Sequence, residues 1–344
     1  MTPPPTETAP LLEVRDVART YPRPRAHPLA PRVFIPAVAD VSLTLARGES
    51  LGVVGESGCG KSTLARLVTA LEPPDRGTVR IAGADPHALP KATLRRLRRR
   101  IQMVFQDPMG SLDPRWTIAR VIAEPLAGLA PEIPRADRRA HAADALAAVG
   151  LGAEALDRYP HQFSGGQRQR IAIARALVTH PDVVVADEPV SALDVSVQAQ
   201  VLNLFLALRH RHGLALLFIS HDLDVVRHVT ERVMVMVQGH VVESGPTRDV
   251  LDRPAHPHTA ALLAAVPRIE AAGQTHTRRG PTGGPASPRR VDSGPGCVYR
   301  ARCPWAVEAC AATAPALRPV GSDRTAACFR ATEVMAAAPA APRA

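Results

Sequence analysis

Hydrophobic and polar positions alternate along two stretches near the start of the chain, 11–17 and 41–45, and this period of two predicts strands. The proline-rich stretch 22–36 between them is expected to be a loop or insertion. Short apolar runs typical of buried strands follow at 51–54, 101–105, 183–186, 214–219 and 233–237. Because helical spacing separates most of these runs, the pattern predicts an α/β domain with a largely parallel sheet covered on both faces.

The same patterns divide the chain into segments. Residues 1–10 are proline-rich and are expected to be a disordered tail before the main domain, 11–266. Within that domain, 117–178 shows apolar stripes at helical spacing and no convincing strand, which predicts a helical subdomain. A Gly-, Pro-, Ser- and Arg-rich composition then predicts a linker over 267–296, followed by a cysteine-bearing segment over 297–330 and a disordered tail over 331–344.

Composition narrows the class of protein. The 344 residues are 46% hydrophobic and 22% charged, as in soluble globular proteins, and no run approaches the roughly 18 apolar residues of a membrane span. The start lacks a secretory signal, so we expect a cytoplasmic protein. The net charge of +10 permits contact with nucleic acid or anionic lipid. Aromatic residues are only 3%, however, so the arginine cluster at 95–100 is better explained as a solvated helix face.

One motif indicates phosphate chemistry. Residues 55–62 fit the pattern G-x-x-x-x-G-K-[ST] between a predicted strand and a predicted helix. Backbone N–H groups of such a loop surround a polyphosphate, Lys61 neutralises its β and γ phosphates, and the Ser62 hydroxyl can ligate Mg²⁺. The alternative is a glycine-rich turn with a surface lysine, and we assign Cys59 no redox role. The expected nucleotide-binding residues are Gly55, Glu56, Ser57, Gly58, Cys59, Gly60, Lys61, Ser62 and Thr63.

Two carboxylates, Asp187 and Glu188, follow the apolar run 183–186, at the strand end where ligands bind in open α/β sheets. One suits Mg²⁺ and the other suits orientation of an attacking water. Such a pair is common at strand ends without any function, but together with a phosphate loop it indicates a catalytic site. Upstream, the sequence Phe-Ser-Gly-Gly-Gln over 163–167 opens a predicted helix and forms a second potential anion site.

With this pentad the chain resembles the ATP-binding cassette (ABC) family over about residues 11–266, with phenylalanine at 163 where leucine is commoner. Gln106 matches the Q-loop of that family, the stretch 191–194 the D-loop and His221 the switch histidine. Tyr21 resembles the aromatic residue that stacks on adenine. The resemblance implies a P-loop NTPase fold of the ABC type, with antiparallel N-terminal strands, a helical subdomain and a small cysteine-rich C-terminal extension.

The resemblance also implies a mechanism in which two cassettes close head to tail around two ATP molecules. Glu188 would then be the general base or water-orienting carboxylate, His221 would contact the γ-phosphate, and Lys61 and Gln106 complete the catalytic set. The implied Mg²⁺ ligands are Ser62, Gln106 and Asp187. The implied nucleotide contacts from the signature and the D-loop, with the signature residues facing ATP on the partner, are Ser164, Gly165, Gly166, Gln167 and Asp194.

Further stretches point to one branch of the family. Residues 106–114 and 256–259 resemble the ATPases of dipeptide, oligopeptide and nickel importers, and 100–105 with 122–125 resembles the F-type member of their D/F pair. His256 and His258 could be mistaken for metal ligands. Histidine at 258 replaces the tyrosine that is usual in that family, which argues against a metal.

The C-terminal cysteines Cys297, Cys303, Cys310 and Cys328 have the spacing C-x5-C-x6-C-x17-C. A reducing compartment disfavours disulfides, so metal binding is expected, and four thiolates suit zinc or a [4Fe-4S] cluster. Zinc sites usually contain a C-x2–4-C pair, which is missing here, and the resemblance of the tail to these importers also favours the cluster. Four free reduced cysteines are the remaining alternative.

We therefore expect an ATP-hydrolysing subunit, with ATP and Mg²⁺, of a bacterial importer for peptides or related solutes. Its expected place is the cytoplasmic face of the cell membrane. The expected partners are a second ATPase subunit of D-type or a copy of itself, two transmembrane permease subunits and, indirectly, an extracytoplasmic solute-binding protein, but no nucleic acid. Nickel or another solute is the alternative, and an exporter or a soluble cassette ATPase acting on ribosomes or DNA is the competing class.

Overall fold

The computed structural model describes residues 9–23, 27, 32–265 and 294–337. Most of the expected N-terminal tail and linker, and the last residues of the expected C-terminal tail, lie outside this part of the chain. No helix within it is long and apolar enough to cross a membrane.

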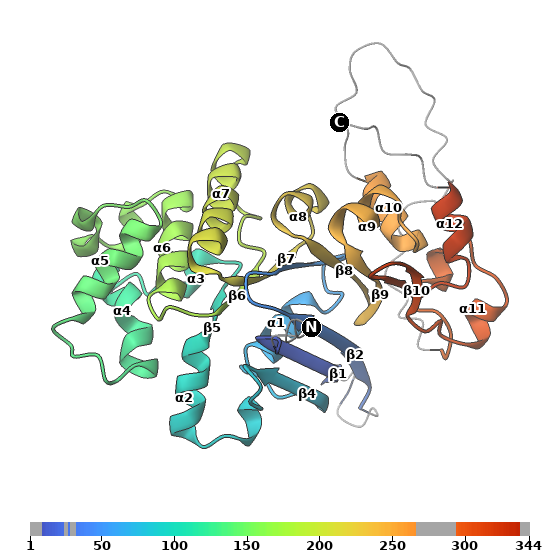
Figure 1. Cartoon of the computed structure of the whole chain (residues 1–344), viewed down its shortest axis with the longest axis horizontal. Coiled ribbons are helices and arrows are strands. Elements are labelled where there is room, and N and C mark those ends of the chain that lie inside the picture. The colour runs from blue at the N-terminus through green and yellow to red at the C-terminus, as the bar shows by residue number, and fades with distance from the viewer. Residues whose placement is uncertain (1–8, 24–26, 28–31, 266–293, 338–344) are drawn as a thin grey trace, which may run out of the picture.

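The main sheet has eight strands in the order β10-β11-β9-β8-β3-β7-β6-β5 (Figure 1). Its five parallel strands are β8 (Arg232–Val237), β3 (Ser50–Val54), β7 (Ala215–Ser220), β6 (Val183–Asp187) and β5 (Ile101–Val104). Antiparallel pairing adds β9 (His240–Pro246), β11 (Arg324–Ala326) and β10 (Arg318–Gly321). The predicted largely parallel sheet is confirmed.

Both faces of the central strands β3, β6 and β7 are buried, as the continuous apolar runs predict. In β6, Val183 and Val185 pack into one core cluster, whereas Val184 and Ala186 pack into the other. This division follows because successive side chains of a strand point to opposite faces. One face packs against α1 (Lys61–Val68) and α2 (Lys91–Arg100). The other is covered by α6 (Gly165–Leu177), α7 (Val195–His212), α8 (Leu223–Val229) and α9 (Thr247–Asp252).

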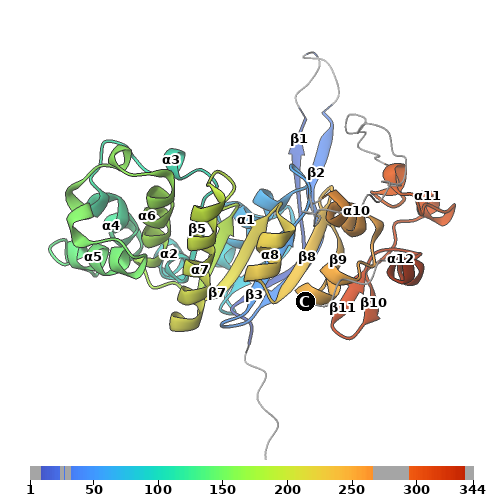
Figure 2. The same ribbon diagram turned by 90° about the horizontal axis from the view of Figure 1, so that it is seen from above.

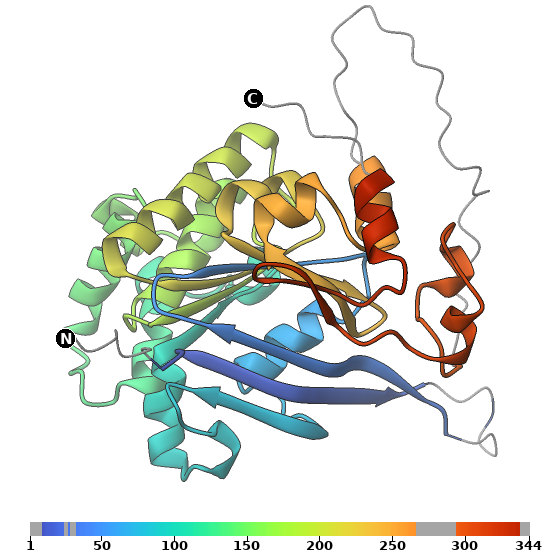
Figure 3. The ribbon, with the colours of Figure 1, turned by 45° about the vertical axis from the view of Figure 1, so that its right-hand side comes forward.

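A second, three-stranded antiparallel sheet has the order β2-β1-β4 and lies below the main sheet in Figure 3. Its strands are β1 (Leu12–Pro22), β2 (Phe34–Leu45) and β4 (Arg76–Ile81). β1 and β2 continue pairing as far as Pro22 and Phe34, inside the stretch that we expected to be a loop or insertion. Val33, just before β2, and Phe34, its first residue, are both exposed, so the hydrophobic pattern that marks half-buried strands is missing there.

The predicted helical subdomain is built from α4 (Ile118–Leu129), α5 (Arg138–Ala148) and α6, with short 3₁₀ turns at 153–157 and 160–162. Figures 1 and 2 show it at the end of the main sheet next to β5. In α4 the buried residues Ile118, Val121, Ile122 and Leu126 recur at helical spacing, so one face of the helix packs on its neighbours.

The C-terminal segment, residues 294–337, joins the main sheet. Its strand β11 pairs with β9 through Thr325 opposite Ser244 and Ala326 opposite Glu243. The segment also contains a 3₁₀ turn at 300–302, α11 (Ala309–Ala312), β10 and α12 (Ala331–Ala337). The sequence indicated a separate small unit followed by a disordered tail, and the structure differs in both respects. The segment extends the main sheet, and residues 331–337 of the expected tail form α12.

Candidate functional site

The phosphate loop connects β3 to α1 and lies closely against the neighbouring backbone. A Cβ atom at Gly60, whose φ is +111°, would lie 1.9 Å from the carbonyl oxygen of Ala37, and one at Gly55 would lie 2.4 Å from that of Met236. Only glycine fits at these two points. The N–H of Gly239 donates to the carbonyl of Cys59 (2.7 Å) and ties the loop to the β8–β9 hairpin.

Lys61 lies over its own loop with only 4% of the residue exposed. Its ammonium donates to the carbonyl oxygens of Gly55 (2.7 Å) and Glu56 (3.1 Å). Cys59 is buried in the core beneath, and burial raises the pKa of its thiol. The thiol is therefore protonated at neutral pH, as expected of a packing residue rather than a reactive one.

The four residues expected to be catalytic lie together. Glu188 directly follows β6 with a φ of +45°, and its N–H donates to the carbonyl of Ile219 (2.9 Å). Its Oε2 atom accepts from Nε2 of Gln106 (3.0 Å) and lies 3.2 Å from Nδ1 of His221. Its Oε1 atom lies 3.9 Å from Nζ of Lys61. Three chain segments thus converge on one carboxylate beside the phosphate loop.

Asp187 and Ser62 provide a setting that fits Mg²⁺. Asp187 is 5% exposed, and burial raises its pKa although a hydrogen bond from Ser62 opposes the shift. Its Oδ1 atom is buried and has no hydrogen-bond partner among the described residues. An uncompensated buried carboxylate oxygen is costly, and oxygen ligands of this kind are those that Mg²⁺ prefers. Gln106, the third predicted ligand, lines the same cleft of about 710 Å³ as Ser62 and Asp187.

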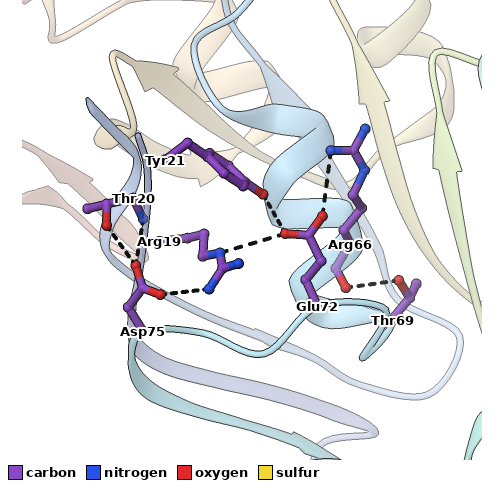
Figure 4. Close-up of polar contacts among 7 residues, drawn as sticks. All are labelled: Arg19, Thr20, Tyr21, Arg66, Thr69, Glu72 and Asp75. Carbon is purple, nitrogen blue, oxygen red and sulfur yellow. Dashed lines mark hydrogen bonds and ion pairs between the residues drawn. The ribbon is translucent and has the colours of Figure 1, made fainter. Parts of the chain in front are cut away.

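Tyr21 lies near the end of β1 and is held by a polar network that Figure 4 shows. Its hydroxyl donates to Glu72, and the guanidinium of Arg19 lies 5.3 Å from the centre of its ring. Glu72 is also 3.8 Å from Arg66 of α1, which links Tyr21 to the helix that follows the phosphate loop. Glu72 was not expected at the site, because a glutamate before two prolines carries no local signal of this contact.

The signature residues cap α6. The Ser164 hydroxyl accepts from the N–H of Gln167 (3.3 Å), and the Gln167 side chain accepts from the N–H of Ser164 (3.0 Å), which is a reciprocal capping box. A Cβ atom at Gly166 would lie 2.2 Å from Val197 of α7, so glycine lets the signature helix approach the D-loop helix, which Asp194 precedes. α6 belongs to the helical part and lies away from α1 in Figures 1 and 2.

The prediction of an iron–sulfur cluster is wrong. All five cysteines lie in the described part of the chain and are free, and no group of three or more His, Cys, Asp or Glu side chains there is arranged to hold a metal ion. The same finding gives zinc no support. Cys297 and Cys310 pack in the core cluster that contains Val184 and Ala186, as small hydrophobic residues do. Burial raises the pKa of Cys297, Cys303 and Cys328, the last to about 11, so these thiols are protonated at neutral pH.

Comparison with known proteins extends the similarity over nearly the whole chain. Residues 38–191 match the ABC transporter family, and residues 242–310 match the C-terminal region of oligopeptide/dipeptide transporters. A putative peptide import ATP-binding protein of Brucella ovis is 46% identical over 329 residues, which cover 94% of this chain and 99% of that protein. The dipeptide transport ATP-binding protein DppF of Escherichia coli is 46% identical over 320 residues, 93% of this chain and 94% of that protein.

Solved structures agree with this family. A dimeric bacterial ABC transporter cassette, seen in one structure in a post-hydrolysis state with ADP and Pi, is 30% identical with a TM-score of 0.60. The match covers 69% of this chain and 99% of the cassette. The chain therefore belongs to the ABC transporter ATPases, in the branch that carries the oligopeptide/dipeptide transporter C-terminal region.

Proposed function

We propose that this ATPase powers the import of peptides or related small solutes, as the F-type subunit of its transporter. The convergence of Lys61, Gln106 and His221 on Glu188 supports ATP hydrolysis at this site. The names of the relatives, which include peptide import and dipeptide transport, support the solute class. Their similarity continues through the C-terminal region that peptide transporters share.

Each side chain has a role that its position allows. Lys61 neutralises the β and γ phosphates, and Ser62, Asp187 and Gln106 hold Mg²⁺, which supplies further positive charge to the phosphates when bound. Glu188 accepts the proton of the attacking water or orients that water. The amide of Gln106, which donates to Glu188, fixes the carboxylate, and His221 contacts the γ-phosphate.

The adenine is proposed to stack on Tyr21. A tyrosine ring offers a flat apolar face, and its hydroxyl contact with Glu72 restricts rotation of the side chain. Arg19 lies near the same ring, so Tyr21 is confined from two directions. Stacking on a preordered ring loses little conformational entropy on binding.

The signature serine is proposed to serve a second ATPase subunit, either a D-type partner or another copy of this chain. Ser164 and Gly165 are exposed at the start of α6, where N–H groups and the helix dipole favour an anion. We place the assembled pair on the cytoplasmic face of the membrane, with two permease subunits and, indirectly, an extracytoplasmic solute-binding protein.

The test is purification of the tagged chain from detergent-solubilised membranes, followed by uptake assays on the reconstituted complex. Co-purification of two polytopic permeases and ATP-dependent uptake of a labelled dipeptide would support the proposal. Ribosomal proteins or DNA in place of permeases would overturn the importer role. Uptake of nickel without uptake of peptides would overturn the solute class alone.

A further inference from the structure

The side chain of Arg302 reaches the phosphate loop from the C-terminal segment. Its NH1 atom donates to both carboxylate oxygens of Glu56, at 2.9 and 3.1 Å. The two residues are 246 positions apart in the chain, and each side chain is 45% exposed. No nucleotide-binding motif in the sequence includes position 302.

A buried aromatic support sets the direction of Arg302. Tyr299 is only 6% exposed, and the Arg302 guanidinium lies 5.2 Å from the centre of its ring. The Tyr299 ring packs on the rings of His256 (5.7 Å) and His258 (5.0 Å), which are themselves 1% exposed. The arginine thus extends from a packed surface rather than from a mobile loop.

Glu56 is part of the loop that the phosphates must approach. Its carbonyl oxygen accepts from the ammonium of Lys61 (3.1 Å) and from the N–H of Cys59 (3.2 Å). Its carboxylate therefore places a negative charge close to a site built to hold an anion. The cation of Arg302 offsets that charge and also restrains the side chain of Glu56.

We propose that Arg302 is a positioning residue of the ATP site, which makes the C-terminal segment part of nucleotide binding. It compensates the charge of Glu56 and thereby sets the affinity for ATP. This inference rests on the proposed binding of ATP at the phosphate loop. It adds a contribution from a region outside the cassette motifs.

The test measures equilibrium binding of AMP-PNP with Mg²⁺ to the full chain. Half-exposed ion pairs contribute about 0.2–1 kcal/mol, so Arg302→Ala should weaken binding about 1.4- to fivefold. Glu56→Gln should instead tighten binding by a similar factor, because it leaves the arginine cation uncompensated beside the phosphates. The double variant should bind nearly as the wild type does, and Arg302→Lys should stay within about twofold of it. Higher salt should reduce the change in affinity caused by each single substitution, because it screens the charges.

Arg330→Ala is the matched control, because Arg330 lies in the same segment and forms its own partly exposed ion pair with Glu333 (2.8 Å). Disruption of the segment would weaken binding in every variant, whereas the proposal requires opposite signs for Arg302→Ala and Glu56→Gln. The inference would be overturned if Arg302→Ala and Arg330→Ala bound AMP-PNP with equal affinity. It would also be overturned if adding Glu56→Gln to Arg302→Ala left the weakened binding unchanged. Lys61→Ala in the same assay separates the inference about Arg302 from the proposed binding of ATP at the phosphate loop. If that variant binds normally, the proposed phosphate site itself fails.

Discussion

Replacing Glu188 by glutamine should slow ATP hydrolysis while strengthening ATP binding. The substitution keeps the size of the side chain but removes its charge and one acceptor oxygen. In the structure Oε2 of that carboxylate accepts a hydrogen bond from Gln106 and lies 3.2 Å from Nδ1 of His221, and Oε1 lies 3.9 Å from Nζ of Lys61. The variant therefore changes the charge at the point where the three side chains meet.

The substitution should change both the rate of hydrolysis and the affinity for ATP. Loss of a positioned base typically costs a factor of about 100 or more, which is about 2.7 kcal/mol in the barrier. Unit charges 3.9 Å apart, as in the pair Lys61 and Glu188, attract by about 1 kcal/mol in a water-like dielectric. Release of Lys61 from that attraction, together with the loss of a negative charge near the phosphates, should tighten ATP binding by about fivefold or more.

The assay compares turnover and ATP binding of Glu188→Gln with those of Glu154→Gln, which makes the same chemical change at an exposed position of the helical part. The control should match the wild type in both measurements. In an assembled transporter, the equivalent glutamate of the partner site must be replaced as well, so that turnover reports a single site. Turnover of Glu188→Gln within about tenfold of the wild type, or weaker ATP binding, would refute the role given to this carboxylate.

Three further predictions concern other parts of the molecule. Lys61→Ala should weaken nucleotide binding at its own loop, whereas Ser164→Ala should spare that binding and slow turnover at the partner's site, as mixed dimers with one variant chain would reveal. Arg324→Ala should destabilise the fold by about 3 kcal/mol in urea unfolding, because it leaves the fully buried Glu243 carboxylate without its cation (2.6 Å). An effect below about 1 kcal/mol would contradict this. Burial lowers the pKa of His258 from 6.5 to about 4. Between pH 6.5 and pH 4 the unfolded chain therefore binds a proton at this residue that the folded chain does not, and the free energy of unfolding falls on acidification. This residue should cost about 2 kcal/mol between pH 7 and pH 5, and His258→Phe should remove that part of the pH dependence.

The sequence by itself determined the catalytic half of the protein. A strand, a glycine loop and a helix are specified by neighbouring residues, so the phosphate loop at 55–62 and the buried strands at 183–186 and 214–219 could be located from spacing alone. The carboxyl ends of parallel strands lie along one edge of the sheet, which is why Glu188 could be expected at the site, whereas His221 was expected there from the resemblance to the ABC family.

Only the tertiary structure showed where the C-terminal segment packs. Its contacts join residues far apart in the chain, such as Arg302 with Glu56 and Arg324 with Glu243, and local periodicity carries no signal of such pairs. The cysteines led to a wrong metal centre for a related reason. Spacing reports which residue types are present, but whether a thiol binds a metal or packs as a small apolar group depends on its three-dimensional neighbours. Here Cys297 and Cys310 pack in the core cluster that contains Val184 and Ala186, and β11 extends the main sheet, so the segment is stabilised by the domain on which it packs.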